Sequence, residues 1–176
     1  MKYDRQARDA MRAQIQNYLL EQNTSFRWQE AEQEIRFVTD VPDAGAEGIA
    51  QCIRLDDDFA LGCASYTAGD GLILGHEAES FVELINSSPA GGCLRLDKTK
   101  GTLFAYWAER FEDGAFTDQQ LRALTVGPAR ELVLCGKTAL QVAMGIKTAA
   151  QAAREIYLIR LMWETCGIQE EDRNEN

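Results

Sequence analysis

The sequence is poor in the residues that build metal and nucleophilic sites. His76 is the only histidine, which excludes a metal site made of several histidines and any mechanism that needs two of them. The five cysteines stand far apart and include no CxxC pair: Cys52, Cys63, Cys93, Cys135 and Cys166. Their odd number and wide spacing argue against a secreted disulfide framework and against a zinc knuckle. The pattern predicts reduced thiols, most of them packed as small hydrophobic residues.

Basic residues are also scarce, because 18 Lys and Arg stand against 28 Asp and Glu, which gives a net charge of −10. Like charges repel at long range, so neither nucleic acid nor an anionic membrane is expected as a partner. An acidic surface suits solubility and the binding of basic protein segments. No run approaches the roughly 18 apolar residues of a membrane-spanning helix, and the first residues lack the apolar stretch of a signal peptide. We expect a cytoplasmic protein.

The hydrophobic pattern of the 176 residues changes period several times along the chain. Apolar residues recur at helical spacing over 3–22 and 78–85, and from 117 to about 163. They alternate with polar residues, as in strands, over 26–28, 35–41, 49–55, 59–66, 93–97 and 102–111. Gly127-Pro128 and Gly145 are expected to divide the last region into three helices. Two capping boxes are predicted, Thr117 with Gln120 and Thr148 with Gln151.

The helices do not alternate regularly with the strands, which disfavours a doubly wound parallel sheet. The order instead predicts an α+β fold, in which an N-terminal helix, a short middle helix and C-terminal helices pack on one antiparallel sheet. We expect residues 1–168 to form a single domain. Residues 169–176 hold four acids and one arginine without apolar periodicity, which predicts a disordered acidic tail.

Motifs for catalysis are absent or incomplete. Gly136-Lys137-Thr138 ends like a phosphate-binding loop, but Glu131 stands where that loop needs glycine, so Lys137 and Thr138 are expected on the wet side of a helix. Glycines 69, 71 and 75 have the spacing GxGxxxG rather than GxGxxG, which favours a flexible connection. His76 follows them at a helix start, where a solvated histidine is usual. We therefore predict no catalytic residue, no cofactor and no metal site.

Apolar surface is in surplus. One face of strand 102–111 presents Leu103, Ala105 and Trp107, while the other presents Phe104 and Tyr106. Such a strand is either covered on both faces within its own chain or leaves aromatic area exposed. The last helix is apolar around most of its circumference, so it is central in its domain or shared with a second chain. We predict a homodimer whose contact includes at least one of five residues: Phe104, Tyr106, Trp107, Tyr157 and Trp163.

The element order resembles that of a known family. The resemblance rests on the N-terminal helix, the hairpin with Phe26, Trp28, Ile35 and Phe37, the later hairpin, the helix start Thr117-Asp118-Gln119-Gln120-Leu121, and the step Met144-Gly145-Ile146-Lys147-Thr148. Over most of residues 5–155 the chain resembles the YbjN-like family, which has the type III secretion chaperone-like fold. The resemblance implies small, acidic, cytoplasmic bacterial proteins that are commonly dimeric. The secretion chaperones bind an extended segment of a client protein, the YbjN branch is described as regulatory, and neither implies catalytic residues.

The leading hypothesis is a non-enzymatic, chaperone-like or regulatory module that binds a segment of a partner protein. The alternative is a small-molecule-binding or catalytic domain with a cleft near His76 and the Gly69–Gly75 loop. A third possibility is a subunit whose role is to complete a larger assembly.

Overall fold

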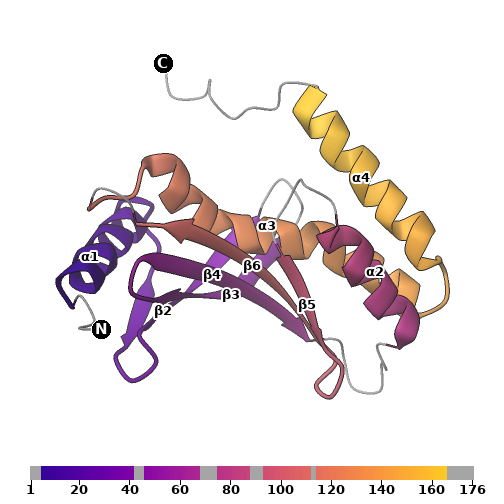
Figure 1. Cartoon of the computed structure of the whole chain (residues 1–176), viewed down its shortest axis with the longest axis horizontal. Coiled ribbons are helices and arrows are strands. Elements are labelled where there is room, and N and C mark those ends of the chain that lie inside the picture. Colours follow the sequence, from indigo (N-terminus) through magenta and orange to yellow (C-terminus); the bar gives the residue numbers. More distant parts are fainter. Residues whose placement is uncertain (1–4, 42–45, 68–74, 88–92, 112–113, 166–176) are drawn as a thin grey trace.

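The computed structural model describes residues 5–41, 46–67, 75–87, 93–111 and 114–165. It has four helices and six strands within these residues (Figure 1). The helices are α1 (Arg5–Glu21), α2 (His76–Asn86), α3 (Asp118–Ala143) and α4 (Ala149–Thr165). The strands are β1 (Phe26–Gln29), β2 (Glu34–Val41), β3 (Ala46–Leu55), β4 (Phe59–Thr67), β5 (Cys93–Asp97) and β6 (Thr102–Arg110).

The six strands form one sheet in the order β1-β2-β3-β4-β6-β5, and every neighbouring pair is antiparallel. The predicted α+β class, with helices packed on an antiparallel sheet, is confirmed. The expected tail, residues 169–176, and most of the Gly69–Gly75 loop lie outside the described residues.

One face of the sheet forms the hydrophobic core. Side chains on successive strands alternate between the two faces, so the register places Ile35, Ile53 and Leu103 on the same face, where all are buried. Against this face the core divides into two clusters. Helix α1 packs with Ile35 and Ile53, whereas α2 and α4 pack around Leu103. Helix α3 contributes to both clusters and so connects the two halves of the core.

Helix α3 runs without a break through Gly127-Pro128, so the prediction of three C-terminal helices is wrong and there are two. Pro128 has no N–H, which leaves the Leu124 carbonyl without its usual helical donor. That carbonyl lies against Gly62 of β4, where an added Cβ would stand 2.5 Å from the Leu124 oxygen. The sheet therefore packs directly on the helix at the proline. Only the step at Gly145, with a φ of +70°, ends the helix.

Local polar contacts stabilise the N-terminal starts of the last two helices, α3 and α4. Both predicted capping boxes are present: the Thr117 hydroxyl accepts the N–H of Gln120 at 3.2 Å, and the Thr148 hydroxyl accepts that of Gln151 at 3.3 Å. The glutamine side chains accept the threonine N–H groups in return. Each box satisfies backbone donors that a helix start leaves free.

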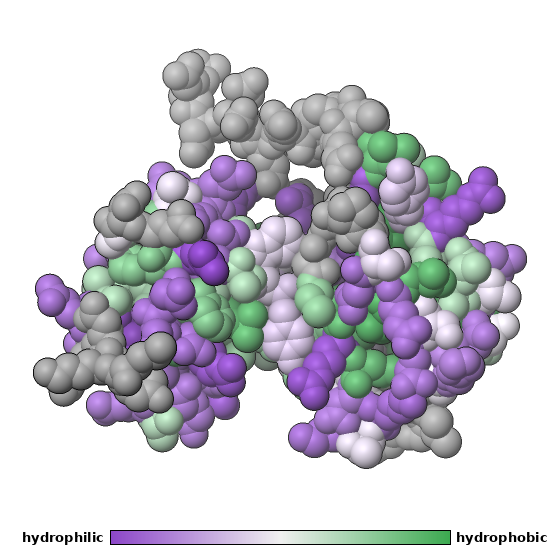
Figure 2. Space-filling model, viewed as in Figure 1, coloured by the Kyte–Doolittle hydropathy of each residue, from purple (hydrophilic) through white to green (hydrophobic). Residues whose placement is uncertain are grey.

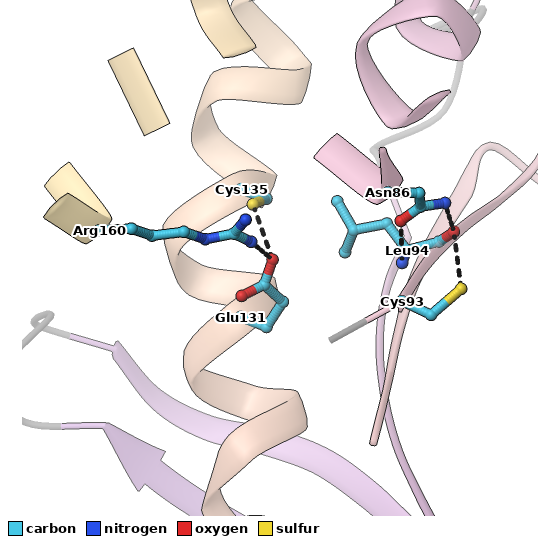
Figure 3. Close-up of polar contacts among 6 residues, drawn as sticks. All are labelled: Asn86, Cys93, Leu94, Glu131, Cys135 and Arg160. Atoms are coloured by element: carbon cyan, nitrogen blue, oxygen red, sulfur yellow. Dashed lines mark hydrogen bonds and ion pairs between the residues drawn. The ribbon is translucent and has the colours of Figure 1, made fainter. Parts of the chain in front are cut away.

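A buried ion pair joins α3 to α4 (Figure 3). The Arg160 guanidinium donates to the Glu131 carboxylate, and the Cys135 thiol lies 3.3 Å from the same oxygen. Burial raises the pKa of Glu131, and the charge of Arg160 opposes that rise. On the same helix α3, Lys137 is exposed, as expected. Thr138 is buried, so the prediction that it faces solvent is wrong.

Candidate binding surface

The second face of the sheet is the candidate site, which we call the open face. Strand pairing aligns its side chains in rows that cross the sheet. One row runs through Arg36, Cys52, Cys63, Tyr106 and Cys93. The next row runs through Val38 and Ala50 to Phe104 and Arg95, and most of its side chains are exposed. The open face is thus the side of the sheet away from the buried core.

The charge of the open face is opposite in sign to that of the whole chain. Its strands carry five exposed arginines: Arg27, Arg36, Arg54, Arg95 and Arg110. The carboxylates of the same strand positions are Glu34, Asp40 and Asp97, so these positions sum to 5 − 3 = +2 on a chain of −10. Charge is therefore segregated, and this face does not suit the basic partner segment that the net charge suggested.

An aromatic pair lies on β6, on the part of the open face that β5 and β6 form. The rings of Phe104 and Tyr106 stack with centroids 6.0 Å apart and an interplanar angle of 23°. Both side chains are half-buried and line an open pocket of about 390 Å³. Arg95 and the turn residues Lys98 and Thr99 form much of the remaining wall. The pocket offers apolar area, a cation and backbone groups together.

The turn that borders the pocket is ordered by its own polar contacts. The Asp97 carboxylate accepts the Thr99 hydroxyl at 2.6 Å and the N–H groups of Thr99 and Lys100 at 3.0 and 3.2 Å. These bonds, the Thr99 hydroxyl first, lower the pKa of Asp97. Lys98 forms an ion pair with Glu79 of α2, which likewise lowers the pKa of Glu79. Asn86 ties α2 to β5 by donating to the Leu94 carbonyl and accepting its N–H, each at 2.8 Å (Figure 3).

The structure separates the five aromatic residues singled out in the sequence. Phe104 and Tyr106 lie together on the open face, whereas Trp107 lies on the opposite face of β6. Its ring packs against α3, where a Cβ added at Gly127 would be 3.3 Å away, and its Nε1–H donates to Glu109 at 2.9 Å. Tyr157 is 54% exposed on α4. The side chain of Trp163 is outside the described part of the structure.

A second exposed surface lies on α4. Ile156 and Arg160 of this helix are buried, and the other side exposes Tyr157, Leu158, Leu161 and Met162, which we call the apolar face of α4. Hydrophobic residues gather at the position of α4 in the space-filling view (Figure 2). Because Arg160 points inward to Glu131, the stretch from Tyr157 to Met162 presents no charge to solvent.

His76, beside which the alternative cleft was expected, begins α2 and follows a loop that lies mostly outside the described residues. The His76 side chain is 87% exposed, and its Nδ1 lies 3.7 Å from the Glu79 carboxylate. Among the described residues, no group of three or more His, Cys, Asp or Glu side chains is placed to hold a metal ion.

No described helix is both long and apolar enough to cross a membrane.

Sequence reasoning missed the basic character of the open face. A signal for it existed, since Arg36 alternates with the buried Ile35 and Phe37, and Arg54 with Ile53 and Leu55. Alternation shows on which face each arginine lies, but strand order is needed to bring them onto one surface.

Comparisons with known proteins place the fold. No protein-family model matches the chain, and no curated protein matches it in sequence. A chain in the structure of the HopA1–SchA chaperone–effector complex aligns with a TM-score of 0.51 at 12% identity, covering 71% of this chain and 91% of that one. YbjN from E. coli aligns with a TM-score of 0.49 at 16% identity, over 74% and 90% of the two chains. The resemblance to the type III secretion chaperone-like fold is confirmed at the level of the fold.

Proposed function

We propose that this protein is a non-enzymatic binding module that holds an extended segment of a partner protein against the open face. The observation that carries the proposal is the stacked Phe104–Tyr106 pair, half-buried on a sheet face that the core does not use. A solvated sheet face usually carries polar residues, so aromatic area there favours a binding role. The fold likeness to a chain of a chaperone–effector complex supports the same class of function.

The chemistry of the face favours an acidic segment with apolar side chains. Arg95 lies directly opposite Phe104 in the β5–β6 pair, so a cation stands beside the aromatic pocket. Arg54 and Arg110 add charge of the same sign along the sheet. An apolar side chain of the segment fills the pocket, while its carboxylates pair with the arginines. The role is chaperone-like or regulatory, and its compartment is the cytoplasm.

The proposal is tested by fluorescence anisotropy on the full chain with three labelled probes. These are a peptide that alternates Asp with Leu, a matched Lys–Leu peptide and a single-stranded oligonucleotide. The Asp–Leu peptide should bind in preference to both others, because its carboxylates complement the arginines and its leucine side chains fill the pocket. The Lys–Leu peptide lacks the carboxylates, and the oligonucleotide has no aliphatic side chain for the pocket. Arg95→Glu should weaken binding by roughly tenfold, which is about 1.4 kcal/mol.

The control is Lys137→Glu, which makes the same charge reversal at an exposed position on α3 and should bind like the wild type. Preference for the oligonucleotide, or equal weakening by Lys137→Glu, would contradict the proposal. Phe104→Ala should also weaken binding, whereas an unchanged affinity would show that the pocket is not used.

We infer that a second copy of the chain covers the apolar face of α4. Two chains of charge −10 repel each other, so they associate most readily where neither presents charge. The stretch from Tyr157 to Met162 is such a surface, and a two-fold axis places the same surface on both subunits. Two of the five residues predicted for the dimer contact belong to α4. Tyr157 is exposed there, and Trp163 follows it on the same helix.

Light scattering at micromolar concentration tests this association. The wild type should have the mass of a dimer, and Leu158→Lys should shift it to the mass of a monomer without loss of helix signal. Val38→Lys places the same charge at an exposed apolar position on the open face, so it should leave the dimer intact. A monomeric wild type, or a dimer that Leu158→Lys does not weaken, would refute the inference.

A further inference from the structure

Two cysteines face each other across neighbouring strands of the open face. In the antiparallel pair of β3 and β4, Cys52 and Cys63 are direct partners, so their side chains leave the same face of the sheet side by side. Both are free and half-buried, in contrast to Cys135, which is packed in the core. The expectation that most cysteines are small core residues therefore does not describe this pair.

The backbone geometry permits a bond between them. Directly opposed residues of an antiparallel pair have Cα atoms roughly 4.5–5.5 Å apart. That spacing falls within the roughly 4.4–6.8 Å that disulfides require. The side chains leave the same face of the sheet, so neither strand needs to shift by a residue.

The surroundings make the two sulfurs unequal. Cys52 is the direct partner of Arg36 on β2, whereas the other neighbour of Cys63 is Tyr106 on β6, which carries no charge. The neighbouring Cys63 thiol lowers the pKa of Cys52, and Arg36 and Arg54 act in the same direction against burial and the Glu34 carboxylate. The Cys52 thiol, together with burial, raises the pKa of Cys63. A cation beside a thiol favours its thiolate, so the position of Arg36 favours Cys52 as the nucleophile.

We propose that Cys52 and Cys63 form a reversible cross-strand disulfide, which makes the centre of the open face a site of oxidation by hydroperoxides. The Cys52 thiolate attacks the peroxide and breaks its O–O bond; hydrogen peroxide leaves a sulfenic acid on Cys52 and, after protonation, one water. The Cys63 sulfur then attacks the Cys52 sulfur and breaks the S–O bond, and the departing hydroxide takes the Cys63 proton as a second water. The two thiols lose two electrons, and the peroxide gains them.

The arrangement selects this pair over the more exposed Cys93. Cys93 lies on the far side of Tyr106, two strands away from Cys63, because both residues pair with Tyr106. Two strand spacings amount to roughly 9.5 Å, which is beyond the reach of a disulfide. Exposure alone would predict that Cys93 is the first to react, whereas thiolate character and a neighbouring thiol predict the Cys52–Cys63 pair. The site does not depend on the partner segment proposed above.

Peptide mapping by mass spectrometry tests the proposal on the full chain after treatment with hydrogen peroxide. Trypsin cleaves after Arg54, and a protease that cleaves before Asp70 separates Cys63 from Cys93, so each cysteine falls on its own peptide. The expected product is a Cys52–Cys63 linked pair that dithiothreitol reverses. Cys93→Ser should form this link like the wild type, while Cys52→Ser and Cys63→Ser should abolish it.

The order of the steps gives a second readout that does not rely on the disulfide itself. Cys63→Ser should leave a sulfenic acid on Cys52 that a cyclic diketone traps, and Cys52→Ser should leave Cys63 largely unreacted. Circular dichroism confirms that each variant is folded before it is compared. Oxidation of Cys93 with Cys52 and Cys63 still reduced, or a link to any other cysteine, would overturn the proposal.

Discussion

Replacing Gly62 by alanine should destabilise the protein through the contact between β4 and α3. An added Cβ would stand 2.5 Å from the Leu124 carbonyl oxygen and 3.1 Å from Pro128 Cγ. The oxygen belongs to the backbone of a 26-residue helix, so it cannot rotate away, and the helix must move by roughly half an ångström or more. Overpacking of this kind costs about 1–3 kcal/mol, and the loss of unfolded-state entropy returns about 0.4–1 kcal/mol.

The net effect of Gly62→Ala is therefore a loss of about 1 kcal/mol, and at most about 2.6 kcal/mol. Urea unfolding followed by circular dichroism resolves this loss as a lower midpoint. Gly136→Ala is the matched control, because it lies inside α3 and an added Cβ there meets nothing within 4 Å. That change should be neutral or raise stability by up to about 1 kcal/mol through helix propensity. If Gly62→Ala were as stable as the wild type, the tight approach of strand and helix at Pro128 would be wrong.

Three further outcomes follow from the same structure. Arg160→Met leaves Glu131 buried without its partner and should cost about 3–5 kcal/mol at neutral pH; the loss should shrink as the pH falls and Glu131, whose pKa is already raised by burial, takes up a proton. Equal destabilisation by Arg160→Met at acid and neutral pH in urea titrations would contradict this. His76→Ala should leave peptide binding unchanged in anisotropy, because the side chain is 87% exposed; a loss of binding would favour the alternative cleft. Residues 1–168 should unfold in one calorimetric transition, since α3 packs in both core clusters, and two resolved transitions would show two domains.

The fold was largely predictable because most of its helices and strands are indicated by local sequence patterns. Alternation around Ile35 and Phe37 and capping at Thr117 are signals carried by residues within a few positions of one another. The continuity of α3 was not predictable in that way. Gly127-Pro128 predicts a break in the helix, whereas the helix continues there beside Gly62, which is distant in sequence and leaves room for the Leu124 carbonyl against the sheet. Tertiary contacts of this kind override local propensity.

The candidate site was predictable only in part. The period of two placed Phe104 and Tyr106 on the face opposite Leu103, but it could not say that Trp107 would be engaged by α3. The sign of the charge on the open face depends on the order of the strands, which the net charge of the chain does not reveal. The Cys52–Cys63 pair depends on register, which the short turn after Leu55 sets and which no cysteine spacing motif records.

Amide chemical-shift mapping on the full, isotope-labelled chain tests most directly whether the open face binds the partner segment. On titration with the Asp–Leu peptide, the shifts should concentrate on β4, β5 and β6, with the largest at Phe104, Tyr106 and Arg95. Saturable shifts confined to α4, or to the start of α2 at His76, would contradict it.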